Sequence, residues 1–247
     1  DYFGNGVAIQ GDLAVVGAPA REVADNGSAY VFQQIGTVWS EQAVLTASDG
    51  ALGDQFGWSV AISGDTVIVG AYGVSGGQGA AYIFVQNGTA WNEQAKLTAS
   101  GGAPGDNLGT SVGIFGDTAV VGANFNDVPT ADQGSVYIFE RTGLNWNQTQ
   151  KLNASDGAAG DQFGFSLAIS GNTIIVGAST DDVGSNADQG SAYVFVYSGS
   201  MWTEQAKLTA TTGAAAYDNF GSSVALSGDT AIVGAPSDGI ALDPGSA

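Results

Sequence analysis

The chain has 247 residues, 44% of them hydrophobic and 10% aromatic, so it carries enough apolar material for a sizeable core. Five Lys and Arg stand against 24 Asp and Glu, and the formal net charge of −19 argues against nucleic acid as a partner. The sequence has no Cys and no His, which excludes disulfides, thiolate zinc sites and His-based catalytic triads. No apolar run reaches the roughly 20 residues of a membrane span, so no membrane insertion is expected.

One motif recurs five times along the chain. The stretch "DYFGNGVAIQGDLAVVGA" at 1–18 returns with substitutions at 54–71, 106–123, 161–178 and 218–235. Its aromatic or Leu position falls at Phe3, Phe56, Leu108, Phe163 and Phe220, at intervals of 53, 52, 55 and 57 residues. Such periods indicate stacked or radial supersecondary units. The repeats are therefore expected to start near residues 1, 54, 106, 161 and 218.

Each repeat predicts two β-hairpins. In the second repeat, "SVAIS" and "TVIVGA" are β-branched, apolar runs joined by a Gly-Asp turn, and the other repeats carry Gly-Asp or Gly-Asn there. Later in each of the first four repeats, a run such as "SAYVFVYSG" precedes one such as "MWTEQAKLTA", and the Trp always stands nine positions after the Tyr. Each complete repeat is thus expected to be a four-stranded antiparallel meander, with strands a to d in chain order. No stretch predicts a helix.

We therefore predict an all-β fold: a β-propeller of four-stranded antiparallel blades, about 53–57 residues per repeat, with at least five blades represented. A parallel β-solenoid is the alternative architecture. Residues 1–247 are expected to form a single propeller domain. Strands a and b suit the buried inner positions, and strand d suits the outer edge, where Lys96, Lys151 and Lys207 would discourage edge pairing.

The last repeat is incomplete. There are five a–b pairs but four c–d pairs, and the sequence stops at "DPGSA", where "DQGSAYVF" at 188–195 shows that strand c would begin. Two explanations are open. The chain belongs to a longer array, or a neighbouring chain supplies the missing strands and builds a head-to-tail polymer.

These motifs resemble the FG-GAP repeat of integrin α-subunit propellers and of many bacterial extracellular proteins. "FG" is followed 14 residues later by the Gly of "GA", and "GAP" itself stands at 17–19 and 234–236. The resemblance implies a propeller that is exported or displayed at the cell surface, with a binding, adhesion or scaffold role. Calcium-binding members carry a long acidic loop between the FG and GAP strands. Here that connection is a short turn, so Asp12, Asp65, Asp117 and Asp229 are interpreted as turn residues.

The connection from strand b to strand c is the part of the repeat whose length varies most. In a meander it emerges on the same face as the d-to-a connection, and loops held by a rigid scaffold often bind ligands. We expect a protein or glycan ligand, or copies of the chain, at this face. Calcium is the one candidate cofactor, because carboxylates gather there at Asp127, Asp132, Asp181, Asp182 and Asp188. The alternative is that these side chains only hydrogen-bond their own turns.

Recurring residues are interpreted as parts of the blade. The Asp of each "DxFG" (Asp1, Asp54, Asp106, Asp161, Asp218) is expected to cap its loop, and the Trp residues and Glu41, Glu93 and Glu204 are expected to be blade positions. No catalytic residue is identified. The function expected is therefore a non-enzymatic extracellular or cell-surface binding or adhesion module. The alternatives are a structural filament subunit and, third, a carbohydrate-active enzyme working through paired carboxylates.

Overall fold

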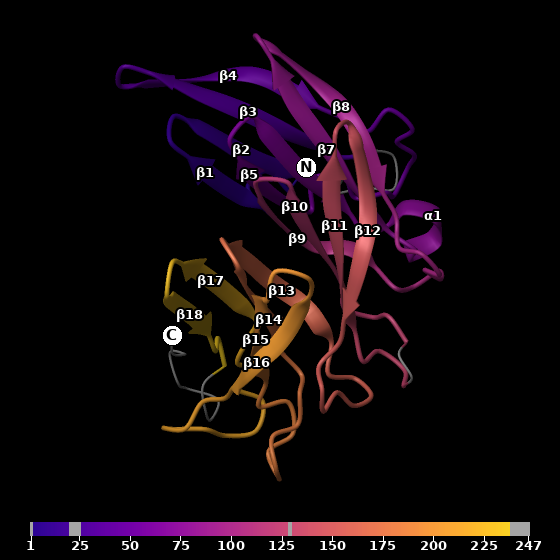
Figure 1. Cartoon of the computed structure of the whole chain (residues 1–247), viewed down its shortest axis with the longest axis vertical. Helices are drawn as coiled ribbons and strands as arrows, with labels where there is room; N and C mark the ends of the chain where they lie inside the picture. Colours follow the sequence, from indigo (N-terminus) through magenta and orange to yellow (C-terminus); the bar gives the residue numbers. More distant parts are fainter. Residues whose placement is uncertain (1, 20–25, 128–129, 238–247) are drawn as a thin grey trace. The chain divides into compact units, whose positions relative to one another are not determined.

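The computed structural model describes residues 2–19, 26–127 and 130–237. Over these residues the chain forms four sheets of four strands and one sheet of two strands, and each sheet contains strands that are consecutive in sequence (Figure 1). The predicted all-β fold of four-stranded antiparallel propeller blades is confirmed. Each blade is a meander because short turns or loops join neighbouring antiparallel strands.

The strands match the predicted a-to-d order in each repeat. The first blade contains β1 (Val7–Gln10), β2 (Leu13–Ala18), β3 (Ser28–Ile35) and β4 (Val38–Leu45). The second contains β5 (Ser59–Ser63), β6 (Thr66–Ala71), β7 (Ala80–Asn87) and β8 (Ala90–Leu97). The third contains β9 (Leu108–Phe115), β10 (Thr118–Ala123), β11 (Ser135–Thr142) and β12 (Asn145–Leu152). The fourth contains β13 (Phe163–Ser170), β14 (Thr173–Ala178), β15 (Ser191–Tyr197) and β16 (Trp202–Leu208). The fifth sheet contains β17 (Ser223–Ser227) and β18 (Thr230–Gly234).

One short helical turn departs from the prediction. It is α1 (Val74–Gly77), in the b-to-c connection of the second blade, and Ser75 and Gly76 inside it have positive φ. The turn is therefore a local loop feature of "YGVSGGQG" and not a periodic amphipathic helix, which explains why the sequence pattern did not indicate it.

The chain divides into two compact units. The first comprises Asp1–Val121 and Ile138–Thr149, and the second comprises Gly122–Tyr137 and Gln150–Ala247. The strands of the third blade are shared between the units. The prediction of one propeller domain over the whole chain stays a prediction.

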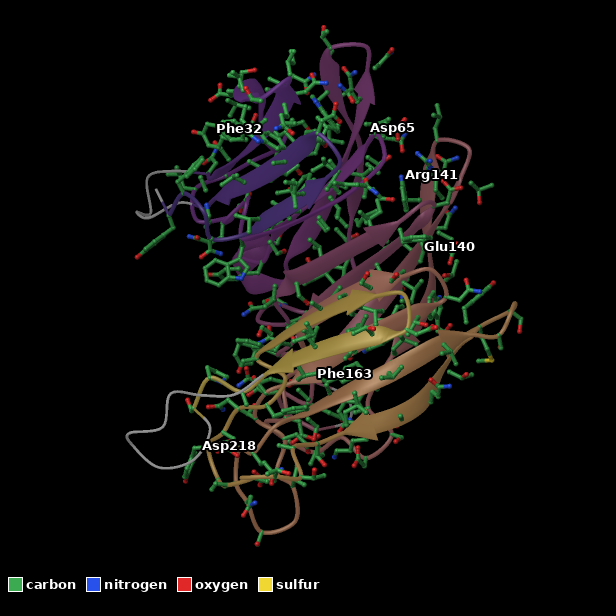
Figure 2. All side chains as sticks on the ribbon, turned by 90° about the vertical axis from the view of Figure 1, so that its left-hand side faces the viewer. Phe32, Asp65, Glu140, Arg141, Phe163 and Asp218 are labelled. Atoms are coloured by element: carbon green, nitrogen blue, oxygen red, sulfur yellow. The ribbon has the colours of Figure 1, made fainter. Side chains whose placement is uncertain are left out.

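The aromatic residue of each "FG" anchors its own blade. Phe56 and Phe163 are completely buried, and each ring packs edge-on against a Tyr and a Phe of strand c of the same blade. Phe163, for example, lies 5.5 Å from Tyr193 and 5.8 Å from Phe195, measured between ring centroids. Figure 2 shows Phe163 among the strands of the second unit. Edge-to-face pairs of this kind add to the stabilisation that comes from burying the apolar area.

The two glycines of the motif let consecutive blades approach closely. Gly57 follows Phe56 with φ +93°, and a Cβ there would overlap the carbonyl oxygen of Ser28 in the first blade. A Cβ on Gly17, in the "GA" of the first blade, would in turn overlap the carbonyl oxygen of Gly57. Only residues without a side chain allow this approach. The FG of one blade therefore packs against the GA of the preceding one.

Candidate binding face

Two polar contacts recur between the outer strands of neighbouring blades. Trp91 on β8 donates from Nε1 to Oε1 of Gln42 on β4 over 3.1 Å, and Trp146 makes the same bond to Gln94 over 2.9 Å. Two residues after a Trp, Glu93 accepts from the backbone N–H and the hydroxyl of Ser48, over 2.8 and 2.9 Å. Glu204 repeats this with Ser155. The predicted blade roles of these Trp and Glu residues are confirmed.

The lysines of strand d do more than protect an edge. Lys96 Nζ lies 2.6 Å from Asp49 Oδ2 and 5.3 Å from the ring centroid of Tyr82, whose hydroxyl donates to the same carboxylate over 2.9 Å. In the fourth blade Lys207 pairs with Asp156 in the same way, above Tyr193. Asp49 and Asp156 lie in the loops that follow the preceding blade. The sequence interpretation, in which these lysines only discourage edge pairing, was incomplete. The sign of an ion pair in the sequence is an Asp that recurs about 50 residues before the Lys.

The Asp of "DxFG" caps its own loop, as predicted. In four repeats its Oδ2 accepts the backbone N–H three residues earlier, at distances of 2.6–2.8 Å. The four residues are Asp54, Asp106, Asp161 and Asp218, and Asp1 lies outside the described residues. Figure 2 labels Asp218 at the loop end of the second unit. All four carboxylates are buried, and each is engaged by the backbone of its own loop.

The b-to-c loops of the third and fourth blades share one local structure, and both lie in the second unit. Asp127 Oδ1 accepts the backbone N–H of Asp132 over 2.9 Å, and Asp182 Oδ1 accepts that of Asp188 over 2.9 Å. Asp132 and Asp188 both have positive φ, at 55° and 50°. A short polar side chain tolerates this conformation better than a branched one. The first Asp of each pair therefore folds the loop that presents the second.

Asp181 is not on the exposed acidic face where the sequence placed it. It is 4% exposed, and its Oδ2 accepts the hydroxyl of Ser191 and lies 2.7 Å from Lys207 Nζ. In the third blade Asn126 takes the same place and accepts from Lys151 over 2.7 Å and from Ser135 over 2.9 Å. Both positions secure strand c of the blade, so the expectation of a peripheral role for Asp181 is corrected.

The buried charges of the fourth blade shift one another's pKa values. The pKa of Asp161 is raised to about 6, chiefly by burial and also by the charge of Asp181, while the hydrogen bond from the Ala158 N–H lowers it. Burial works to lower the pKa of Lys207, but hydrogen bonds to Asp156 and Asp181 hold it above its ordinary value. Burial also raises the pKa of Tyr193, with Asp181 and Asp156 adding to the effect.

The five predicted metal ligands are thus distributed over three places. Asp127 lies with Asp132, Asp182 lies with Asp188, and Asp181 is buried against Lys207. Across residues 2–19, 26–127 and 130–237, no group of three or more Asp, Glu, His or Cys side chains is arranged to hold a metal ion. Calcium binding by these loops stays a prediction. Each loop supplies a pair of carboxylates, and a calcium ion there would need further oxygen ligands besides them.

The repeat geometry described above matches a known family. The model of the FG-GAP repeat matches residues 1–32, 39–84, 91–139, 146–195 and 202–247. The chain belongs to the FG-GAP repeat family. Each internal FG-GAP match begins at strand d of one blade and ends in strand c of the next, so the sequence repeat is offset by one strand from the structural blade. This offset makes each repeat span a blade junction, where the FG and GA glycines meet.

Comparison with solved structures supports the fold and no more. A crystal structure from Bacteroides uniformis, provisionally described as a 6-phosphogluconolactonase, superposes with a TM-score of 0.59 at 11% sequence identity. The match covers 85% of this chain and 58% of that one, so the FG-GAP chain spans little more than half the length of this neighbour. Among curated proteins, no sequence matches this chain. None of the helices in the described part of the structure has the length and apolar character to cross a membrane.

Proposed function

We propose that this FG-GAP chain is a non-enzymatic binding or adhesion module, exported or displayed at the cell surface, whose acidic loops contact a protein or glycan ligand. The observation that carries the proposal is the shared structure of the two loops, in which Asp127 and Asp182 bond to Asp132 and Asp188. Loops that are folded before a ligand arrives lose less conformational entropy on binding. The association of FG-GAP repeats with extracellular proteins supports the location.

The charge of the second unit favours a ligand with basic groups. Lys151 and Lys207 are its only basic residues, and both are engaged within the blades. Asp127, Asp132 and Asp182 are exposed, and within the described residues no ion pair neutralises them. A basic protein surface would gain from this field in both association rate and orientation.

A non-enzymatic role is proposed because the sequence lacks the groups that most hydrolytic mechanisms use. It has neither His nor Cys, and the carboxylates of the DxFG motif are committed to loop caps. The structural neighbour described as a lactonase shares the fold at 11% identity, and a shared fold alone does not assign its activity to this chain.

Binding by the loop face is tested with charge-neutral loop variants. Asn at positions 127, 132, 182 and 188 keeps the side-chain oxygen that folds each loop but removes the four charges. We expect this variant to keep its melting temperature and to bind a fluorescent octalysine peptide, or hits from a glycan array, roughly tenfold or more weakly than the unaltered chain. Asp229→Asn, in the exposed β17–β18 turn of the same unit, is the control and should bind normally. Equal binding by the four-site variant would refute the loop face as the site.

Calcium is proposed as the one cofactor, with the same loops as its site. If the loops bind calcium, millimolar calcium raises the melting temperature through mass action, and the four-site Asn variant loses that increase. Identical melting curves in chelator and in millimolar calcium would remove calcium from the proposal.

A second candidate function is structural assembly. In this function a strand of another chain would extend the sheet of β17 and β18, the two strands described in the last repeat, by backbone pairing. Light scattering and electron microscopy of the purified chain distinguish the two functions. Discrete single molecules support a binding module, and filaments support a structural subunit.

A further inference from the structure

Trp58 is the one tryptophan of the chain that lies outside strand d. The others lie on β4, β8, β12 and β16, at Trp39, Trp91, Trp146 and Trp202. Trp58 instead follows the FG of the second blade, and its ring packs edge-on against Tyr72, with centroids 4.8 Å apart and an interplanar angle of 79°. Tyr72 follows the GA of the same blade, where the b-to-c loop begins. The pair therefore lies at the end of the blade from which the b-to-c and d-to-a loops emerge.

The backbone holds the residue after FG in the same way in every repeat. In all five repeats its N–H donates to the carbonyl three residues earlier, as Trp58 does to Gln55 over 3.2 Å. Thr110 and Ser222 stand at this position in the third and fifth repeats, and their hydroxyls bond the same carbonyl over 2.8 and 2.7 Å. The blade therefore does not need an aromatic ring here.

The position of Tyr72 carries no aromatic residue in any other repeat. Its equivalents, in chain order, are Pro19, Asn124, Ser179 and Pro236. Asn124 and Ser179 are buried, whereas Trp58 and Tyr72 both keep part of their surface open to solvent. Because the other blades form without these two rings, blade formation does not account for the pair.

The polar atoms around the pair are uncharged and available to a ligand. Within the described residues, neither Nε1 of Trp58 nor the hydroxyl of Tyr72 forms a hydrogen bond. Burial alone raises the pKa of Tyr72, with no contribution from a neighbouring charge. Asn5 of the first blade donates from Nδ2 to the carbonyl of Trp58 over 2.7 Å, which holds its side chain beside Trp58 and leaves Oδ1 as an acceptor.

These groups fit a neutral sugar. A pyranose such as glucose presents C–H groups that pack on the electron-rich face of an aromatic ring, and its hydroxyls need donors and acceptors at the rim. The net charge of −19 disfavours sugars that carry carboxylate or sulfate groups. A polyproline peptide docks in a groove lined by aromatic rings, whereas two rings in edge-to-face contact leave no slot between them.

We propose that Trp58 and Tyr72, with Asn5, form a stacking site for a neutral glycan. A sugar ring lies on the open aromatic surface, and its hydroxyls bond to the Tyr72 hydroxyl and to Asn5 Oδ1. The site lies within the first unit, where β5 contacts both β1 of the first blade and β9 of the third. It is separate from the acidic loops of the second unit and stands whether or not those loops bind a ligand.

The test uses the full 247-residue chain with cellohexaose, laminarihexaose and xylohexaose as probes. We expect at least one of them to bind saturably at millimolar concentration or below. In NMR spectra the indole N–H signal of Trp58 should shift on binding, while the indole signals of the strand d tryptophans stay in place. Trp58→Phe identifies the Trp58 signal by its absence, and because it keeps a ring it should bind within roughly threefold of the unaltered chain.

The role of the rings is tested with residues that another blade already carries. The double variant Trp58→Thr, Tyr72→Asn copies the third blade, which has Thr110 and Asn124 at these positions. We expect it to fold and to bind the sugar more weakly by roughly tenfold or more. Phe165→Thr removes an exposed ring from the position after FG in the fourth blade and is the control, with normal binding.

Four results would overturn the proposal. They are an absence of binding by all three hexasaccharides, equal binding by the double variant, indole shifts at the strand d tryptophans instead of Trp58, and binding of decaproline in place of the sugars. The last would make the occupant a peptide. If the double variant does not fold, the indole signals of the unaltered chain decide.

Discussion

Lys207 and Asp181 form a 2.7 Å ion pair in which the carboxylate side chain is only 5% exposed. The pair joins the outermost strand of the fourth blade to the loop that precedes its third strand. At the same position in the third blade, neutral Asn126 accepts from Lys151. An acceptor oxygen is thus common to both blades, while the negative charge is not.

This comparison predicts that Asn, but not Ala, can replace Asp181. Asp181→Ala leaves Ser191 without its acceptor and Lys207 with one partner, so we expect the free energy of unfolding to fall by about 2 to 3 kcal/mol. Asp181→Asn should cost less than about 1 kcal/mol, because Asn126 already works in the third blade. Urea denaturation of both variants measures the difference. An Ala variant as stable as the unaltered chain would show that the Asp181 carboxylate does not stabilise the blade.

The raised pKa of Asp161 predicts a stability that declines as the pH rises. Its pKa is raised from 3.8 to about 6 in the folded chain by burial. A folded pKa above the unfolded value gives a contribution that is complete below about pH 4 and is lost as the pH passes through about 6. Asp161→Asn keeps an acceptor for the N–H of Ala158 and should lack this decline. Unfolding free energies of both proteins between pH 4 and 7 are compared, and parallel curves would contradict the prediction.

Asp49 and Asp156 act in the opposite direction, so the pH range matters. Burial tends to raise the pKa of Asp156, but hydrogen bonds from Lys207 and Tyr193 lower it overall, and the hydrogen bond from Lys96 lowers that of Asp49. Their stabilisation is complete above about pH 4 and is lost in acid. Above about pH 4 these two carboxylates no longer change the stability. Burial also raises the pKa of Glu140, so the comparison with Asp161→Asn, rather than the pH range alone, identifies the contribution of Asp161.

The tryptophans of strand d should differ in what their N–H contributes. Trp91 donates to Gln42, whereas the buried Nε1 of Trp202 has no hydrogen-bond partner within the described part of the chain. Trp91→Phe should lower the unfolding free energy by about 1 kcal/mol more than Trp202→Phe. Trp91→Phe removes a hydrogen bond, whereas Trp202→Phe removes an N–H whose burial without a partner already costs stability. Chemical denaturation of the pair is the measurement. A larger loss for Trp202→Phe would imply a partner for its N–H.

The FG glycine should be more sensitive to substitution than a turn glycine. Gly57 and Gly64 both have positive φ, but a Cβ on Gly57 overlaps Ser28 whereas one on Gly64 meets nothing within 4 Å. Both Ala variants carry the conformational cost of about 1 kcal/mol. Gly57→Ala should lose a further 1 to 3 kcal/mol, roughly, because the blades must separate. Equal melting temperatures for the two variants would show that the junction tolerates a side chain.

The local parts of this fold could be predicted from the sequence because they repeat and depend on near neighbours. Glycines at positions such as Gly64 have the positive φ that the hairpin turns need, and the apolar runs form the strands. The loop caps at Asp54 and its equivalents were also predictable, since the acceptor and donor lie three residues apart. The offset between sequence repeat and blade follows from the same motif, once strands are assigned.

Burial of individual carboxylates was decided only by the tertiary structure. Asp181 and Asp182 are adjacent and no local pattern distinguishes them, yet Asp181 is buried against Lys207 and Asp182 is exposed on the loop. The difference arises because Lys207 reaches Asp181 from another strand of the blade, 26 residues away along the chain. The sequence by itself determined the repeat, the strands and the turns, since these follow from local pattern. Which charges are paired and which can meet a ligand depended on the packing of distant segments, because burial and ion pairing are properties of three-dimensional neighbours.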